Sequence, residues 1–569
     1  YRGYDSVGAA TIHSDGVIDL RKDVGKVDVV SLRHDFAAMW GKRGIVQLRW
    51  ATFGNPSQAN AQPHLDSDGD LVGAHNGNVV NNVELRQQFL NEGMIVRSDN
   101  DGESCVHAVE RYVDRGYDMV QSIRNAYDDL RGDYAFVIGH VNEDRLHAIK
   151  KGSGLVVGLA EGATVISSDL PSILPLTRKI LRVQDGEIVT FWANGAELRR
   201  VSDGAIIERA PELITESMEA AAKGGFDHFM TKEIYEQPKL AGELVRLLAE
   251  YSDMKVITER MRHARHLYLV GCGTSYHACI LGALYLARLA NRPAIPMLAP
   301  QFIAQYGPAL SAEDVVMFVS QSGETKDVLQ ALEIAQRKRT ATFGLVNVVG
   351  STLMAQTERH IPLACGYEIS VPATKTFLNQ CVAFLFSAMF MGGHDTTSMH
   401  DLLSLLERTL ELVDAPVRSL SQMLVGQDDL YCLGYGLTYP IALEGALKFK
   451  EVTYAHCEGM LSTEFKHGPL SAVYEGYPVL FVAGTEDTPV MVSGINEVAC
   501  RGGIAIVVGT NDSQLRSNAH HMVAVPPSDP HFHPLAAVLP LQLLSYQVCV
   551  GRGLDPDFPR NLSKTLTVD

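Results

Sequence analysis

Three ionisable side chains recur at helical spacing in an apolar segment of the last third of the chain. Glu444, Lys448 and Glu451 interrupt a run of Ile, Ala, Leu, Phe and Val between residues 440 and 454. At about 100° per residue they project from one stripe of a predicted helix. Two carboxylates that flank an amine suit proton transfer on a small substrate. The commoner fate of such residues is a solvated helix face with i,i+4 pairs, and spacing alone does not separate the two.

Two further residues could take part in such chemistry. His467, in the segment KHGP, is a candidate acid or base, although a lone histidine is more often a structural hydrogen-bond partner. Lys564, five residues from the end of the chain, could form an imine with a carbonyl substrate. From the residues alone we interpret it as part of a solvated terminus.

A serine-rich turn between a predicted strand and a predicted helix suggests an anion site. The apolar residues 315–319 predict the strand, and SQSGET opens a helix that continues to residue 335. A helix N-terminus offers unpaired N–H groups and a partial positive charge to a phosphate. The turn adds hydroxyl and amide donors from Ser320, Gln321, Ser322 and Thr325. Thr274 and Ser275 occupy the equivalent strand end of the neighbouring unit. Two such loops favour a phosphate site over ordinary helix caps.

This phosphate-type loop occurs twice, 163 residues apart. Three pairs of segments align at this offset: GCGTSY (271–276) with GYGLTY (434–439), GAL (282–284) with GAL (445–447), and VSQSGET (319–325) with VAGTEDT (482–488). A constant offset predicts a duplicated α/β unit. The second loop carries two acids where a phosphate would sit. We therefore predict that one lobe holds the substrate and the other carries the reaction.

The composition limits the class of protein. The chain has 569 residues, 46% of them hydrophobic, and a net charge of −17, which argues against nucleic-acid or anionic-membrane surfaces. No apolar segment is expected to reach membrane-spanning length, and no signal-peptide pattern opens the chain. Nine cysteines without a C-x-x-C pair indicate reduced thiols in a cytoplasm and no zinc site. We expect no metal and no cofactor. The chain begins with Tyr1 rather than Met, so we expect a fragment or a processed form.

The pattern of elements predicts an α/β protein of several domains. Short strand-like runs such as residues 44–50, 134–138 and 163–167 indicate a sheet-rich first domain over residues 1–216. A linker is expected at 217–226. Beyond it, strands alternate with helices, which predicts two doubly wound lobes at 227–410 and 411–555. A short tail at 556–569 follows an apolar helix near 539–550.

Together these motifs resemble a known family. CGTSY, SQSGET, ALEGALKFKE, KHGP and PRNLSKTLTV are similar to the sugar-isomerase half of the glutamine–fructose-6-phosphate aminotransferases (isomerizing). YRGYDS, RWAT, PH, HNG and NDGE, followed by KEIYEQP, resemble their glutaminase half, an α/β sandwich of the N-terminal-nucleophile type. The resemblance covers essentially the whole chain, in the right order. It implies transfer of the glutamine amide nitrogen to fructose 6-phosphate and isomerisation to glucosamine 6-phosphate, the first step of UDP-N-acetylglucosamine synthesis.

The resemblance also implies roles for individual residues of the isomerase half. Fructose 6-phosphate would be bound by Thr274, Ser275, Ser320, Gln321, Ser322, Thr325, Val371 and Ala373. His467, from a neighbouring subunit of a homodimer or larger homo-oligomer, would open the sugar ring, and Lys564 would form an imine at C2. Glu451 would move the proton between C1 and C2, supported by Lys448 and Glu444. Ala373 stands where the family commonly has serine, which makes other sugar substrates more plausible.

In the glutaminase half the resemblance implies a glutamine site. Arg49, Thr52 and Asp101 would bind glutamine, Asn76 and Gly77 would form the oxyanion hole, and Trp50 would gate an ammonia channel. Phe53 replaces the family's common histidine. The family's nucleophile is an N-terminal cysteine in a segment that precedes YRGYDS, and Cys105, in a predicted helix, cannot replace it. We therefore expect either a truncated chain whose glutaminase half is inactive, or a protein that uses free ammonia.

Two other functions stay open from the sequence. One is an ammonia-dependent isomerase or deaminase of amino-sugar phosphates built on the same lobes. The other is a non-catalytic sugar-phosphate sensor, against which stand Glu451, Lys448, His467 and Lys564, since a sensor would not need them.

Overall fold

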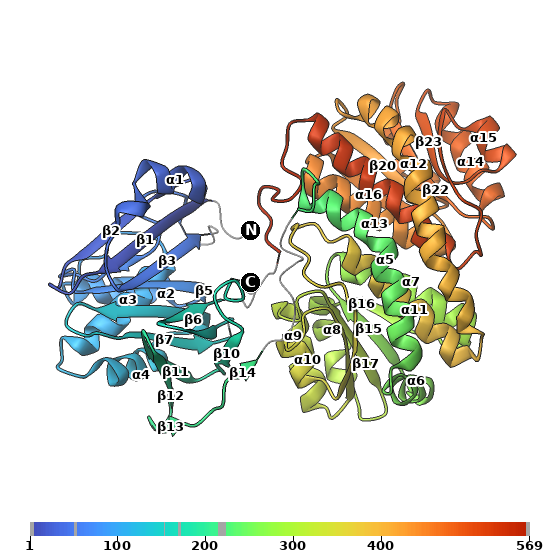
Figure 1. Ribbon diagram of the computed structural model, residues 1–569. Coiled ribbons are helices and arrows are strands. Elements are labelled where there is room, and N and C mark those ends of the chain that lie inside the picture. Colours follow the sequence, from blue (N-terminus) through green and yellow to red (C-terminus); the bar gives the residue numbers. More distant parts are fainter. Residues whose placement is uncertain (1–4, 50–53, 153, 169–171, 214–222, 565–569) are drawn as a thin grey trace. The chain divides into compact units, whose positions relative to one another are not determined.

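The computed structural model describes residues 5–49, 54–152, 154–168, 172–213 and 223–564. The chain forms two compact units, Arg2–Glu219 and Ala220–Thr565, which are described separately below (Figure 1). The first unit is rich in strands and the second alternates strands with helices. This mixed α/β organisation confirms the predicted fold class.

The N-terminal unit is built on a seven-stranded antiparallel sheet with strand order β13-β12-β11-β7-β6-β5-β4. Two smaller sheets have the orders β2-β1-β3 and β14-β10-β8-β9. The strands are β1 (Ser6–Ile12), β2 (Ile18–Val24), β3 (Arg43–Arg49), β4 (His64–Leu65), β5 (Leu71–Val79), β6 (Gly132–His140), β7 (Leu146–Lys151), β8 (Val156–Ala160), β9 (Ala163–Ser167), β10 (Lys179–Arg182), β11 (Glu187–Trp192), β12 (Gly195–Arg200), β13 (Ile206–Ile207) and β14 (Glu212–Leu213). The helices are α1 (Val27–Arg33), α2 (Asn82–Asn91), α3 (Asp101–Val113) and α4 (Met119–Asp129).

Strand alternation explains the layers of this unit. On β6, Phe136 and Ile138 enter the core that the large sheet forms with α2, α3 and α4. The intervening Ala135 and Val137 point to the other face and pack with apolar residues of β1, β3 and β8. Because successive side chains of a strand point to opposite faces, one sheet serves two cores.

The C-terminal unit contains two five-stranded parallel sheets of the same topology, β16-β15-β17-β18-β19 and β21-β20-β22-β23-β24. The strands of the first lobe are β15 (Leu267–Gly271), β16 (Ile295–Leu298), β17 (Val315–Ser320), β18 (Ala341–Val346) and β19 (Arg359–Pro362). Those of the second lobe are β20 (Asp429–Gly434), β21 (His456–Leu461), β22 (Pro478–Ala483), β23 (Ile504–Thr510) and β24 (His521–Val525). Each strand of the second lobe begins within two residues of the position that the 163-residue offset predicts. The duplication is therefore present in the fold.

Helices cover both faces of these sheets. They are α5 (Phe229–Glu250), α6 (Met254–His263), α7 (Thr274–Ala290), α8 (Ala299–Gln305), α9 (Lys326–Arg337), α10 (Thr352–Gln356), α11 (Lys375–Gly392), α12 (Leu402–Leu424), α13 (Tyr439–Thr453), α14 (Thr488–Ala499), α15 (Ser513–Asn518) and α16 (His533–Gly551). One continuous core joins residues of both lobes through α5, α7, α11, α12, α13 and α16. The lobes form a single compact unit, while the domain boundaries suggested by the sequence stay a prediction.

The expectation that no apolar segment reaches membrane-spanning length is wrong for α16. Among the described residues this helix alone is long and apolar enough to cross a membrane, and 83% of its most apolar window is buried inside the protein. It packs against α12 and α13, so its apolar residues serve the core between the lobes.

Candidate active site

A cavity of about 120 Å³ lies at the carboxyl ends of β15 and β17. The strand order of the first lobe reverses between these two strands, and ligands of doubly wound sheets bind at such switch points. The cavity is lined by Cys272, Thr274, Ser275, Val319, Ser320, Gln321, Ser322, Thr325, Val371, Ala373 and Lys564. The structure thus brings together all eight residues that the resemblance placed at the sugar phosphate, and adds Lys564.

The SQSGET turn is held by hydrogen bonds between its own residues. The Ser320 hydroxyl accepts a hydrogen bond from the Gly323 N–H at 3.0 Å and lies 3.2 Å from the Thr325 hydroxyl. Thr325 is the N-cap residue of α9, but its side chain makes no capping hydrogen bond. The interpretation of Thr325 as an ordinary cap therefore does not hold, and the residue lines the cavity.

Gly323 is required by the shape of this turn. Its φ is +67°, a left-handed conformation that glycine adopts without strain. A Cβ atom at this position would lie 2.1 Å from the Ser351 hydroxyl oxygen. Both the backbone conformation and the close packing exclude a side chain, which lets the backbone of the turn approach a ligand.

The carboxylates and amine of α13 form a buried ionic group. Lys448 Nζ lies 2.5 Å from Glu451 Oε2 and 3.3 Å from Glu444 Oε1. The side chains of Glu444 and Lys448 are fully buried, and that of Glu451 is 18% exposed. The alternative of a solvated helix face is therefore excluded. Charges in the interior persist only when they are paired and hydrogen-bonded, as they are here.

Burial and pairing set the protonation of this group. Burial by itself would lower the pKa of Lys448, but the carboxylates of Glu444 and Glu451 outweigh it and raise that pKa above its ordinary value. Burial raises the pKa of Glu451, and the nearby Lys448 ammonium opposes that rise. A carboxylate with a raised pKa is a stronger base than a solvated one, which suits proton abstraction.

Thr274 joins the cavity to the ionic group. It lines the cavity, its hydroxyl donates to Glu444 Oε1 at 3.1 Å, and it accepts a hydrogen bond from Lys448 Nζ at 3.1 Å. The sequence suggested Thr274 only as a phosphate ligand. Its position at the first residue of α7, opposite α13, gives it this second set of contacts.

Two polar residues of the site were missed from the sequence. His277, one turn after Thr274 on α7, contacts Glu444 Oε2 through Nδ1 at 2.8 Å. Gln380 of α11 donates to the Ser275 hydroxyl at 2.9 Å and is buried. The histidine could have been suspected from its helical spacing to Thr274, whereas no local signal marks Gln380.

Lys564 is not a solvated terminus. Its Nζ lies 2.5 Å from Glu368 Oε2 and donates to the Ser370 carbonyl at 2.8 Å, and its side chain is 8% exposed. The tail therefore returns to the first lobe and places an amine at the cavity. Within one chain His467 takes no part in this arrangement, because it is exposed on the short helix Phe465–His467 and does not line the cavity.

The predicted glutamine-site residues lie in neighbouring elements of the N-terminal unit. Arg49 ends β3, is buried, and donates to the Gly54 carbonyl at 2.8 Å. Asp101 begins α3, and its carboxylate accepts a hydrogen bond from the Val79 N–H at 2.9 Å and lies 3.2 Å from His75 Nε2. Burial would raise the pKa of Asp101, but His75 and the hydrogen bonds to the carboxylate lower it overall.

Asn76 and Gly77 follow His75 directly on β5. The structure therefore brings them close to the Asp101 carboxylate, and Gly77 has a φ of +125°. Trp50, Thr52 and Phe53 lie outside the described residues. In the described part of the chain no group of three or more His, Cys, Asp or Glu side chains could hold a metal ion.

Comparison with known proteins defines the class of this chain. A SIS domain model matches residues 260–390 and 423–551, and a glutamine amidotransferase domain model matches residues 48–175. The chain thus combines an amidotransferase domain with two SIS domains. It is 38% identical to the glutamine–fructose-6-phosphate aminotransferase (isomerizing) of Methanothermobacter thermautotrophicus and 37% identical to that of Aquifex aeolicus, over 100% of this chain and 96% of each relative.

The chain belongs to the glutamine–fructose-6-phosphate aminotransferase (isomerizing) family. A solved structure agrees with this conclusion: the C-terminal domain of glucosamine-fructose-6-phosphate aminotransferase from Francisella tularensis matches with a TM-score of 0.55 and 29% identity, over 59% of this chain and 100% of that one. The resemblance seen in the sequence motifs is confirmed.

Proposed function

We propose that this protein transfers the amide nitrogen of glutamine to fructose 6-phosphate and isomerises the product to glucosamine 6-phosphate. The observation that supports this most directly is the position of Thr274. Its hydroxyl contacts Glu444 and Lys448 while the residue lines the cavity of the SQSGET turn. A phosphorylated sugar held by that turn thus lies beside the ionic group of α13.

The SQSGET turn and the first turn of α7 bind the phosphate. Both present hydroxyl groups at a helix N-terminus, where the partial positive charge stabilises a dianion. Val371 and Ala373 close the cavity around the sugar. Lys564 attacks the C2 carbonyl, so that a carbon–nitrogen double bond forms and the carbonyl oxygen leaves as water.

Ammonia then replaces the lysine at C2. Glu451 removes a proton from C1 and returns it to C2, while the O1 hydroxyl proton passes to the nitrogen, which leaves an aldehyde at C1 and an amine at C2. The Lys448 ammonium, held by Glu444, keeps the Glu451 carboxylate oriented and stabilises its charge.

The remaining roles belong to a second copy of the chain and to the N-terminal unit. The exposed His467 of a second copy opens the sugar ring, which requires a homodimer or a larger homo-oligomer. Arg49, Thr52 and Asp101 bind glutamine, Asn76 and Gly77 stabilise the oxyanion, and Trp50 gates the ammonia channel. All nine cysteines are free thiols, which supports a reducing, cytoplasmic location.

A product assay with two nitrogen sources tests this function. The protein is incubated with fructose 6-phosphate and either glutamine or ammonium chloride, and glucosamine 6-phosphate is measured by mass spectrometry. Product with both nitrogen sources supports a glutamine-dependent isomerising aminotransferase. Product with ammonium alone locates the activity in the isomerase unit. Absence of product in both reactions, or ammonia release from glucosamine 6-phosphate that exceeds synthesis, rejects the proposal.

A further inference from the structure

Glu368 holds the tail lysine in a fixed position. It lies between β19 and α11, and its side chain is fully buried. Besides Lys564, its carboxylate accepts hydrogen bonds from the N–H groups of Thr374 at 2.9 Å and Thr376 at 3.1 Å, and from the Thr376 hydroxyl at 2.8 Å. Four donors fix the orientation of this carboxylate, so the Lys564 amine has one defined place at the cavity.

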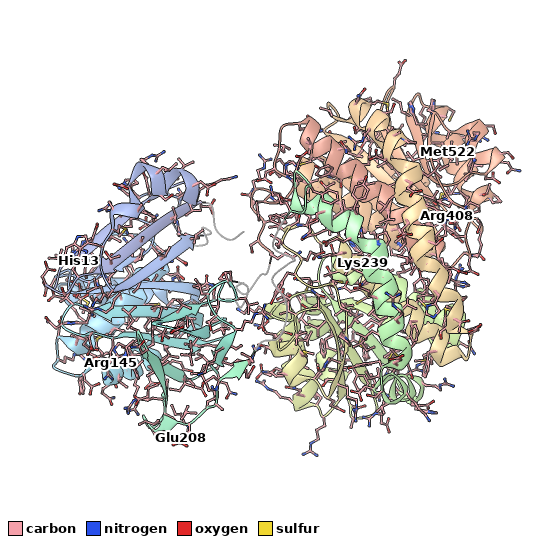
Figure 2. All side chains as sticks on the ribbon, in the orientation of Figure 1. His13, Arg145, Glu208, Lys239, Arg408 and Met522 are labelled. Atoms are coloured by element: carbon pink, nitrogen blue, oxygen red, sulfur yellow. The ribbon has the colours of Figure 1, made fainter. Side chains whose placement is uncertain are left out.

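The KEIYEQP segment (residues 232–238) of α5 braces the same region. Glu233 is buried and accepts hydrogen bonds from the N–H groups of Ile369 at 2.5 Å and Ser370 at 3.3 Å. Glu236 pairs with Lys375 at 3.0 Å. Three residues after Glu236 on the same helix, Lys239 is exposed (Figure 2), so the buried charges of α5 belong to its first turns.

The first turn of α5 also fixes the tail. The Asp557 carboxylate accepts hydrogen bonds from the N–H groups of Phe229 at 2.9 Å and Met230 at 2.7 Å. The Asp557 carbonyl in turn accepts from the Val371 N–H at 2.9 Å. The segment around Glu368 and the tail that carries Lys564 are therefore held by one helix.

We propose that Glu368 positions Lys564 and accepts its ammonium proton when the imine with the sugar forms, a role that rests on the proposed function of Lys564. The ammonium gives one proton to the carboxylate. The resulting amine forms the bond to C2, and its two remaining protons leave with the carbonyl oxygen as water. The Glu368 carboxyl group holds the transferred proton until the lysine is released.

The surrounding charges allow Glu368 to do this. Burial, together with the charge of Glu368, raises the pKa of Glu233 to about 8, so Glu233 holds a proton at neutral pH. Burial would also raise the pKa of Glu368, but Lys564 and the hydrogen-bond donors lower it overall. Glu368 is therefore the ionised carboxylate of this buried pair. The other titratable and charged groups that interact with Glu368 or Lys564 are Cys365, Glu451 of α13 and Lys375 of α11, which pairs with Glu236 of α5.

Proton transfer within the Lys564–Glu368 pair changes no overall charge. The rate of imine formation is therefore expected to be independent of pH between about 6 and 8. Without the carboxylate the ammonium proton must leave to solvent, and the fraction of amine in such an exchange rises about tenfold for each pH unit.

Borohydride trapping of the imine with fructose 6-phosphate tests the proposal. The adduct on Lys564 is quantified by peptide mass spectrometry from pH 6 to 9 in the wild type and in Glu368→Gln, Glu368→Asp and Glu236→Gln. We expect Glu368→Gln to trap at least ten times more slowly at pH 7 and to gain about tenfold per pH unit. Glu368→Asp should keep the flat profile, and so should Glu236→Gln, which alters the same cluster without touching Lys564. A flat profile at the wild-type rate in Glu368→Gln overturns the role of Glu368.

The controls separate this inference from the proposed function. Absence of a Lys564 adduct in the wild type would reject the imine itself, and Lys564→Ala should show none. If Glu368→Gln fails to fold, which its melting curve shows, the profile of Glu368→Asp decides alone. A slope of about tenfold per pH unit in that variant would contradict transfer to a carboxylate.

Discussion

Replacement of Lys448 by Met should destabilise the C-terminal unit by about 3–5 kcal/mol at pH 8, because it leaves two carboxylates beside each other without their cation. Lys448 is fully buried between Glu444 and Glu451, at 3.3 and 2.5 Å. Met fills a similar volume, so the decrease in the free energy of unfolding reflects the missing charge rather than a new cavity. The matched control is Lys450→Met on the same helix, where the side chain is exposed and the expected change is below about 0.5 kcal/mol.

The loss should shrink at lower pH. The Lys448 ammonium lowers the pKa of Glu451, so its removal raises this pKa further above the unfolded value. The folded variant then binds more protons than the unfolded chain. Its deficit is smallest below the unfolded pKa of about 4.3 and grows as pH rises through the raised folded pKa. At pH 5 the variant should therefore recover part of the stability that it lacks at pH 8.

Two optical signals separate the units in this experiment. All three tryptophans, at positions 40, 50 and 192, belong to the N-terminal unit, so their fluorescence in urea reports that unit. Far-ultraviolet circular dichroism is dominated by the helices of the C-terminal unit. Only the second transition should move in Lys448→Met. A loss below about 1 kcal/mol at pH 8, or an equal loss at pH 5 and pH 8, would refute the argument that the buried charges are mutually dependent.

Three further predictions follow from single contacts. Thr274→Val removes the hydroxyl between the cavity and Lys448. It should lower the free energy of unfolding by about 1–3 kcal/mol and raise KM for fructose 6-phosphate. An unchanged KM would contradict the place of Thr274 in the site. Gly323→Ala should abolish sugar-phosphate binding measured by calorimetry, whereas Gly366→Ala, at a similar positive φ but with open space around it, should retain it; equal binding by both would refute the clash. In the N-terminal unit, burial opposes the charge on His107, but two glutamates raise its pKa to about 9. This pairing stabilises the unit fully below about pH 6.5, and the stabilisation is lost as pH rises through about 9. The melting temperature followed by tryptophan fluorescence should therefore change less between pH 6 and 10 in His107→Gln than in the wild type.

The sequence was sufficient for the elements and for the repeat. Strands with alternating or continuous apolar residues and helices with a polar stripe are local patterns in the sequence. The 163-residue offset then predicts each strand of the second lobe from a strand of the first. The SQSGET turn could be placed because a strand, a glycine and hydroxyl residues together specify a strand-to-helix turn. α7 begins at Thr274, which brings both hydroxyl residues, Thr274 and Ser275, into its first turn.

Contacts between distant segments could not be predicted in this way. His277 meets Glu444 across 167 residues, and Glu368 meets Lys564 across 196. Helical spacing is the same whether a polar stripe faces water or a second helix, so the burial of Lys448 depends on α7 packing against α13. For the same reason composition could not distinguish a buried core helix such as α16 from a membrane span.

One position of the duplicated loop, Asp487 in the second lobe and Glu324 in the first, explains why the two lobes differ in anion binding. In the second lobe, the Asp487 carboxylate accepts hydrogen bonds from the Gly484 N–H at 3.1 Å and from the Thr438 hydroxyl at 3.2 Å. The loop thus supplies its own anion, and a phosphate there would meet a negative charge. Glu324 is the equivalent residue of the first lobe, and its carboxylate turns outward to accept from the Thr352 N–H at 2.8 Å. The donors of the first loop are left for a ligand, which explains why the cavity described above lies in that lobe.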